Sequence, residues 1–254
     1  MHIRTWFICG ATMLPLVALA DDAPPPPPQG VWTGKGQLGY TGSQGNTSGS
    51  SANAGIDMGL LVDPWEHKLH LAALYGKSAG IVSTERYDAG WQSQYNFSTA
   101  FFAFGALRYQ RDLFSGFQYD ASETVGAGYK IFNTDSLKLS TQVGVGYREE
   151  RPEDLVLQPD GSYLRTPLDN DNSVVGTFGL DYSQYFTKTT NLSNKLLVEI
   201  GSGNKLITDT IALTVKMSTR LALSLAYNIQ DNTSPPDGLK KIDSTETANL
   251  VFAF

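Results

Sequence analysis

The sequence predicts an all-β fold, a single transmembrane antiparallel up-and-down β-barrel of about twelve strands. Three observations predict it. Segments of about ten residues recur in which every second side chain is apolar or aromatic, the pattern of strands that span an outer membrane. The connections between these segments are alternately short and long. The chain opens with an export signal and closes with an alternating apolar segment.

A secretory signal peptide is expected at residues 1–20. Arg4 precedes an apolar stretch from Trp6 to Leu19, and small residues lead to a predicted cleavage site after Ala20. The alternative is a membrane anchor, which needs an apolar run long enough to cross the bilayer. This run is short and contains Pro15. We therefore expect export and location in the cell outer membrane.

Residues 21–29 form a proline-rich periplasmic lead-in before the barrel domain at 30–254. Five consecutive prolines, Pro24–Pro28, favour a stiff polyproline II spacer, although they also suit a proline-binding module. Cys9 is the single cysteine of the chain and lies within the signal. Small exported domains often rely on disulfides, so the mature chain must be stabilised by its sheet instead.

The clearest strand is "RLALSLAYNIQ" at 220–230, where leucines alternate with small and polar residues. The same period gives twelve predicted strands, an even number as in bacterial single-chain barrels. Their ranges are 30–42, 48–61, 67–76, 86–97, 100–111, 117–131, 137–149, 172–186, 192–201, 205–217, 220–230 and 244–254.

A soluble β-sandwich also alternates, but two features favour the barrel. Short connections such as "VDPWE" and "NTDS" occupy every second position, with longer ones such as 76–85, 150–171 and 231–243 between them. This places the short turns and both termini in the periplasm and the long loops outside. The aromatics also gather near segment ends on the apolar face, as interfacial girdles do: Trp32, Trp65, Trp91, Tyr95, Tyr109, Tyr129, Tyr147, Tyr182, Phe186, Tyr227 and Phe254.

The chain ends "NLVFAF", which places Leu250, Phe252 and Phe254 on one face of the last strand. We interpret these residues as a C-terminal assembly signal with Phe254 on the lipid face. The expected partners are outer-membrane lipid, periplasmic chaperones and the barrel-assembly machinery, and we expect a monomer.

Composition excludes several functions. The full chain has a net charge of −6, which argues against nucleic acid as a partner. His67 and His70 are the only histidines after the signal, and the mature chain offers no cysteine to complete a metal site. No cofactor is expected.

The inward faces are predicted to carry charges of both signs. A lumen of about twelve strands is narrow. Paired charges would make it rigid, whereas unpaired charges would line a passage for small polar solutes. The residues assigned to the lumen are Lys35, Asp57, Arg108, Lys130, Arg148, Asp181, Lys195, Glu199 and Lys216.

Two other functions remain open at this point. The 150–171 loop suits a structural or surface-binding barrel without transport. An outer-membrane lipase or protease needs a nucleophile with a histidine or a carboxylate pair. We place His70 on the lumen face near the periplasmic end, away from lipid, and interpret Glu149-Glu150 and Glu153-Asp154 as solvated loop charges. We expect no enzyme activity.

Several stretches resemble the family of putative salt-induced outer membrane proteins, the YdiY-like proteins. They include "WTGKGQLGYTGSQGNTS" at 32–48, "FGALRYQRDLFSGFQYD" at 104–120, "GAGYKIF" at 126–132 and "GVGYREE" at 144–150. The resemblance covers nearly all of the mature chain, with a small departure at Gln110-Arg111-Asp112. It implies an outer-membrane barrel and an envelope stress-related role, and it carries over no catalytic residue because the family has no established activity.

Overall fold

The computed structural model describes residues 29–43, 49–159, 163–236 and 239–254. The predicted signal peptide and most of the proline-rich lead-in lie outside the described residues. Gln29, the last residue of that lead-in, pairs with Leu61, and the N–H of the following Gly30 donates to Leu61 O at 2.7 Å.

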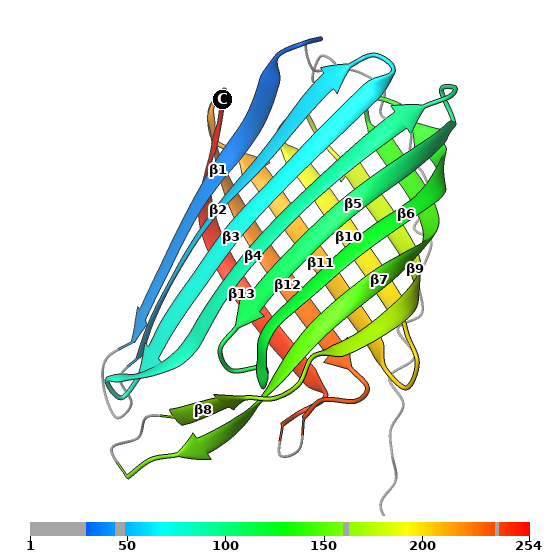
Figure 1. Ribbon diagram of the computed structural model, residues 1–254. Helices are drawn as coiled ribbons and strands as arrows, with labels where there is room; N and C mark the ends of the chain where they lie inside the picture. The colour runs from blue at the N-terminus through cyan, green and yellow to red at the C-terminus, as the bar shows by residue number, and fades with distance from the viewer. Residues whose placement is uncertain (1–28, 44–48, 160–162, 237–238) are drawn as a thin grey trace, which may run out of the picture.

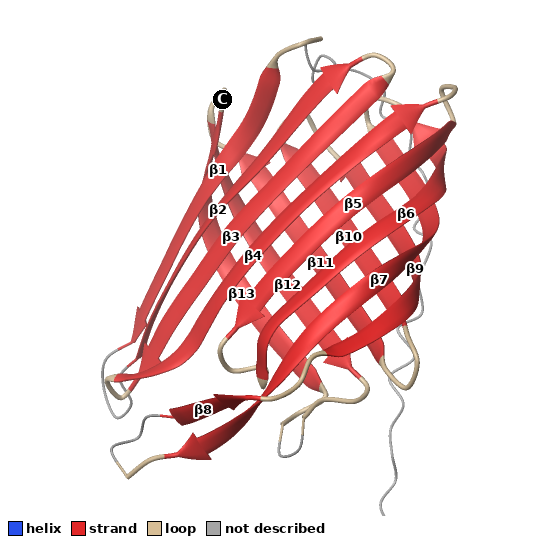
Figure 2. Ribbon diagram, viewed as in Figure 1, coloured by secondary structure: helices blue, strands red, loops and turns tan. Residues whose placement is uncertain are grey.

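The described residues form thirteen strands and, as Figure 2 shows, no helix. Correspondingly, no helix in them is long and apolar enough to cross a membrane. The strands are β1 Trp32–Ser43, β2 Gly49–Val62, β3 Trp65–Ser78, β4 Ile81–Asn96, β5 Phe101–Asp112, β6 Phe117–Asn133, β7 Leu137–Leu157, β8 Tyr163–Pro167, β9 Asp171–Tyr185, β10 Thr190–Ile200, β11 Lys205–Lys216, β12 Leu221–Asn232 and β13 Ile242–Ala253.

Twelve of these strands form a closed antiparallel barrel, which confirms the predicted fold class and strand number. Each strand pairs with its neighbours in sequence, and β1 pairs with β13 to close the ring. The strands are tilted against the barrel axis, as closure requires (Figure 1). β8 stands outside the ring and pairs only with the distal part of β7.

The two ends of the barrel differ. Short turns connect the strands at the end where the C-terminus lies, which we call the termini end (Figure 1). The opposite end, the loop end, carries the β7–β8 hairpin and the 233–241 connection. The predicted alternation of connections is therefore present only in part, because the loop-end connections 113–116 and 201–204 are as short as the termini-end turns 97–100 and 186–189. Two further corrections follow.

The first correction concerns the expected long connection at 76–85. β3 continues to Ser78 and β4 starts at Ile81, so only Ala79 and Gly80 form the turn. Both have positive φ, 50° and 82°, the conformation that a tight two-residue hairpin needs. The strands predicted at 67–76 and 86–97 are accordingly longer than expected.

The second correction concerns 150–171, which was expected to be an irregular loop. β7 runs on to Leu157, and β8 pairs back along it from Leu157↔Tyr163 to Glu153↔Pro167. On the barrel side, the Glu153 N–H donates to Gly116 O at 2.9 Å. Phe114 packs edge-on against Tyr163 with ring centroids 6.3 Å apart. The segment is thus a hairpin anchored to the β5–β6 turn.

The outer face of the barrel is apolar and exposed, the reverse of a soluble domain. Along β12, Leu223 and Leu225 are 45% and 52% exposed, whereas the intervening Ala222 and Ser224 are 7% and 6% exposed. No second sheet of the described chain covers these leucines, which rules out the β-sandwich. An exposed apolar face of this extent needs lipid as its solvent, so the protein is a membrane β-barrel.

Aromatic side chains mark both edges of the apolar face, as expected at membrane interfaces. At the termini end, Trp65 packs against Tyr95 with ring centroids 5.1 Å apart, and Phe101 packs against Tyr129 at 4.8 Å. The loop end has its own pair, Tyr109 stacked on Tyr119 at 6.1 Å.

Part of the interior is filled by two aromatic rings of β5. Phe102 and Phe104 point inward and are 3% and 6% exposed. They lie directly over Gly128 and Gly126 of β6, where an added Cβ would come within 2.1 Å of the Phe102 ring and 2.8 Å of the Phe104 ring. These glycines therefore allow close approach, and any larger residue would displace the rings.

The last residue of the chain takes part in barrel closure. Gly34 N–H donates to Phe254 O at 2.9 Å, and Phe254 N–H donates to Gly34 O at 3.0 Å. Leu250, Phe252 and Phe254 all lie on the exposed outer face, at 50%, 45% and 55% exposure. The seam between β1 and β13 is thus covered by the three residues predicted to direct assembly.

Replacing Phe254 with Asp should lower the yield of folded barrel in the membrane, because a charge then replaces the apolar contact beside the closing hydrogen bonds. The fraction of heat-modifiable, fully folded protein in isolated membranes measures this. Val156→Asp, an equivalent change on the exposed β7–β8 hairpin, is the matched control. Equal folded yields for the two variants would contradict the assembly role.

Candidate functional site: the charged lumen

The nine residues predicted to line the lumen are placed on the inward face of the sheet. Strand register puts Lys35 opposite Asp57 and Lys195 opposite Asp181. The other five are Arg108, Lys130, Arg148, Glu199 and Lys216, and they divide between two regions that differ in burial and partners.

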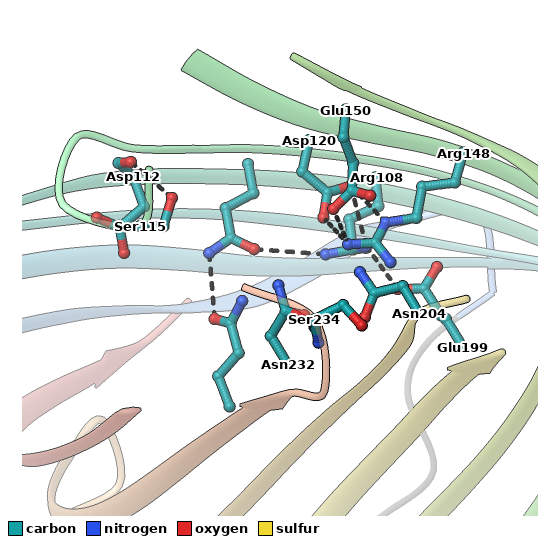
Figure 3. Close-up of polar contacts among 12 residues, drawn as sticks. Arg108, Asp112, Ser115, Asp120, Arg148, Glu150, Glu199, Asn204, Asn232 and Ser234 are labelled. Atoms are coloured by element: carbon teal, nitrogen blue, oxygen red, sulfur yellow. Dashed lines mark hydrogen bonds and ion pairs between the residues drawn. The ribbon is translucent and has the colours of Figure 1, made fainter. Parts of the chain in front are cut away.

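An arginine cluster lies near the loop end and consists of Arg108, Arg148, Asp120, Glu150 and Glu199 (Figure 3). Arg148 Nη2 lies 3.0 Å from Asp120 Oδ2 and also contacts Glu150 Oε1. Arg108 Nη2 lies 2.5 Å from Glu199 Oε2 and 3.4 Å from Asp120 Oδ1. Arg148 and Glu199 are each only 2% exposed, so the centre of the cluster is dry.

The cluster joins strands that are not adjacent in the barrel. Arg108 comes from β5 and Glu199 from β10, and β6, β7 and β9 lie between them in the ring. A second bridge runs from Arg86 of β4, whose Nη1 donates to Gln230 Oε1 of β12 at 3.2 Å. The Arg86 guanidinium is also held by Asp88 at 2.9 Å. These links therefore cross the lumen near the loop end.

Glu150 corrects the interpretation of Glu149-Glu150 as solvated loop charges. Its side chain belongs to β7, is 6% exposed and pairs with Arg148. Glu153 is also buried, at 5%, and pairs with Arg165 at 2.7 Å. The alternation of the strand could have assigned Glu150 to the lumen, because Arg148 and Glu150 are two residues apart and therefore share a face.

Asp120, Arg86 and Asp88 were also missed as lumen residues. Asp120 accepts from both arginines of the cluster and is 7% exposed. Each of the three lies two residues from other inward polar positions, so the period of two could have identified their face. Arg86 and Asp88 pair with each other on β4, and Asp120 meets arginines of the two strands that pair with β6.

The termini end of the lumen is lined differently. Lys35 Nζ lies 3.6 Å from Asp57 Oδ2, and His70 Nδ1 lies 2.6 Å from Asp57 Oδ1. The Lys35 and His70 side chains are 54% and 45% exposed, so this part of the lumen is open to water. His70 thus faces the lumen near the termini end, as the alternation predicts.

The structure also shows a serine and histidine pair on the outer face that the sequence analysis did not identify. His67 Nδ1 lies 2.9 Å from Ser93 Oγ, which also accepts from the Trp91 indole N–H at 2.9 Å. The His67 ring is stacked on Trp65 with an interplanar angle of 4°.

A hydrolytic triad needs a third group that orients the histidine. Within the described part of the chain, neither ring nitrogen of His67 contacts a carboxylate or an amide. The pair therefore satisfies polar atoms within the aromatic belt. In the same described residues, no group of three histidine, cysteine or carboxylate side chains could hold a metal ion.

Truncating Arg148 to Ala should destabilise the barrel strongly, because Asp120 and Glu150 then remain buried without their main cation. The expected loss of unfolding free energy is about 3–5 kcal/mol. Urea unfolding in lipid vesicles, followed by tryptophan fluorescence, measures it. Lys195→Ala is the matched control, since Lys195 also faces inward but is exposed. Similar midpoints for the two variants would show that the cluster does not stabilise the barrel.

Comparison with known proteins identifies the family. A family model described as "Protein of unknown function, DUF481" matches residues 36–254. The uncharacterized protein YdiY of Escherichia coli (strain K12) is 23% identical over 258 residues, covering 97% of this chain and 95% of YdiY.

Two solved porin structures are similar to this chain at lower sequence identity. The NanC porin has a TM-score of 0.49 at 9% identity, covering 87% of this chain and 98% of its own. The KdgM porin has a TM-score of 0.45 at 11% identity, covering 88% and 99%. The family match spans the whole barrel from β1 to the terminal Phe254, and the chain belongs to the DUF481 family.

Proposed function

We propose that this protein is an outer-membrane channel of narrow bore that passes small polar solutes. The observation that carries the proposal is the ion pair between Arg108 and Glu199, which joins the non-adjacent strands β5 and β10 across the lumen at 2.5 Å. A polar constriction with hydrogen-bonding groups of both signs admits small hydrated solutes and excludes large or apolar ones.

The remainder of the interior supports the same function. Polar side chains are present on the lumen face at both ends of the barrel, and the termini half is open to water, as the 54% exposed Lys35 side chain shows. Gln92 of β4 and Gln142 of β7 approach to 3.4 Å within the interior and leave amide groups along the wall. Such an interior is costly unless it meets water or solute, because buried polar groups need partners.

A structural or surface-binding barrel without transport is the second candidate. It is favoured by Phe102, Phe104 and the buried Arg148, which fill much of the lumen. The anchored β7–β8 hairpin would supply the binding surface. Conduction distinguishes this candidate from a channel. We propose no enzyme activity, since neither His67 nor His70 has the partners of a hydrolytic site.

In planar bilayers, wild-type protein should give small, low-conductance currents. Replacing both Arg108 and Glu199 with Ala should raise the conductance several-fold, because the constricting pair is removed without leaving either charge unpaired. The matched control removes Arg165 and Glu153, an ion pair of 2.7 Å on the hairpin beyond the barrel. Large ohmic channels from the wild type would contradict the narrow bore. Silence of both proteins would favour the structural candidate.

We further propose that the chain is cleaved after Ala20 and forms a monomeric outer-membrane barrel with both termini in the periplasm. Periplasmic chaperones and the barrel-assembly machinery would assist its insertion.

The predicted mature chain lacks cysteine, so single introduced cysteines report topology directly. Val156→Cys on the hairpin should react with an impermeant maleimide on intact cells, whereas Ser136→Cys in a short turn should react only after lysis. The reverse labelling would overturn the orientation, and an uncleaved chain in the inner membrane would overturn the location.

A further inference from the structure

The basic residues of the lumen are separated by type along the barrel axis. The inward lysines all lie within five residues of the termini end of their strands: Lys35, Lys68, Lys130, Lys138, Lys195 and Lys216. The inward arginines Arg86, Arg108 and Arg148 lie toward the loop end. We call the first region the lysine vestibule. The sequence shows only that charged residues of both signs occur on the inward faces. The fold places the lysines near the termini end and the arginines nearer the loop end.

The lysine vestibule has an excess of positive charge. Three inward carboxylates, Asp57, Glu66 and Asp181, accompany its six lysines, which leaves three lysines in excess. Lys68 and Lys130 share Glu66, at 3.2 and 4.0 Å. The arginine cluster shows the opposite balance, because its two guanidinium groups face three carboxylates.

Part of this charge is unpaired. Among the described residues, no carboxylate lies within 4.0 Å of Lys138, Lys195 or Lys216. Lys216 lies over the Tyr185 ring, with its Nζ 5.5 Å from the ring centroid. Lys195 of β10 and Lys138 of β7 flank β9 on its two sides, so both face the same part of the lumen.

Solvation also differs between the two regions. The side chains of Lys35 and Lys68 are 54% and 47% exposed, and Lys138, Lys195 and Lys216 are exposed as well. Arg148 in the arginine cluster is 2% exposed. Five of the vestibule lysines therefore carry hydrated ammonium groups, whereas Lys130 is 20% exposed and donates to Asn96 Oδ1 at 2.9 Å. The guanidinium groups of the cluster are engaged with protein carboxylates.

We infer that the lysine vestibule binds small oxyanions, solutes that carry phosphate or carboxylate groups, and delivers them to the constriction. An ammonium group is a compact point charge suited to such ligands. A cleft lined by one sign of charge between low-dielectric walls raises the local concentration of the opposite ion. This inference rests on the proposed channel function and adds the class of its solute.

Isothermal titration calorimetry of the detergent-solubilised full barrel with pyrophosphate tests binding without requiring conduction. We expect saturable binding that weakens by about tenfold when Lys138 and Lys195 are both replaced by Gln. Since neither lysine has a carboxylate partner, the double variant should fold normally, which its heat-modifiable migration checks. Lys205→Gln, an exposed lysine at the loop end of β11, is the control and should bind as the wild type does.

A parallel titration with citrate separates the two chemical groups. Tighter binding of citrate would assign the vestibule to carboxylates, and tighter binding of pyrophosphate would assign it to phosphates. Failure of the wild type to bind either anion would overturn the inference. So would binding that the double variant retains in full.

The channel proposal can be tested independently of the oxyanion-binding vestibule. Lysine-dependent binding by a barrel that is silent in bilayers would uphold the oxyanion vestibule and refute transport. Conduction that shows no anion preference in a salt gradient, together with no pyrophosphate or citrate binding, would uphold the channel and refute the vestibule.

Discussion

Backbone hydrogen bonding across the seam between β1 and β13 is the interaction on which the rest of this structure depends. In a bilayer, each backbone N–H and C=O must find its partner within the protein, and a strand can do so only in a closed sheet. Lys35 to Leu38 pair with Leu250 to Ala253, and Gly34 exchanges two further bonds with Phe254. Without this seam, β1 and β13 would each expose an unpaired edge to lipid.

Closure fixes the environment of every side chain. Once the ring is closed, alternate residues face lipid or lumen, so the leucines of β12 are exposed while Ser224 is buried. The lumen then has to accommodate polar groups at close quarters. Near the loop end it does so by pairing Arg108 with Glu199 across the lumen and Arg148 with Asp120 of the adjacent strand. The polar interior is therefore a consequence of the closed sheet.

The two halves of the interior satisfy their charges by different means. Arg148 and Glu199 of the arginine cluster are buried, and its guanidinium groups contact several carboxylates at once, which suits the planar, multidentate donor of arginine. The lysines at the termini end lie in water, where an ammonium group can remain hydrated. A solute that enters at the termini end would first meet mobile, solvated cations and then a rigid, paired constriction. This order is compatible with selection by charge before selection by size.

The sequence by itself determined the strand number, the faces of the strands and the apolar C-terminal segment. These features are local, because a period of two and a short turn can be seen within about ten residues. The continuation of β7 through Glu150 follows the same period of two, and Glu150 pairs with Asp120 of β6 and Asp171 of β9.

Only the tertiary structure decided which charges meet. Arg108 and Glu199 are 91 residues apart in sequence, and His67 meets Ser93 on a neighbouring strand only in the actual register. Strand tilt and stagger set which inward residues of distant strands reach the same height in the barrel. The separation of lysines from arginines follows from that geometry, because the alternation defines a side chain's face and the closed barrel defines its depth and its partners.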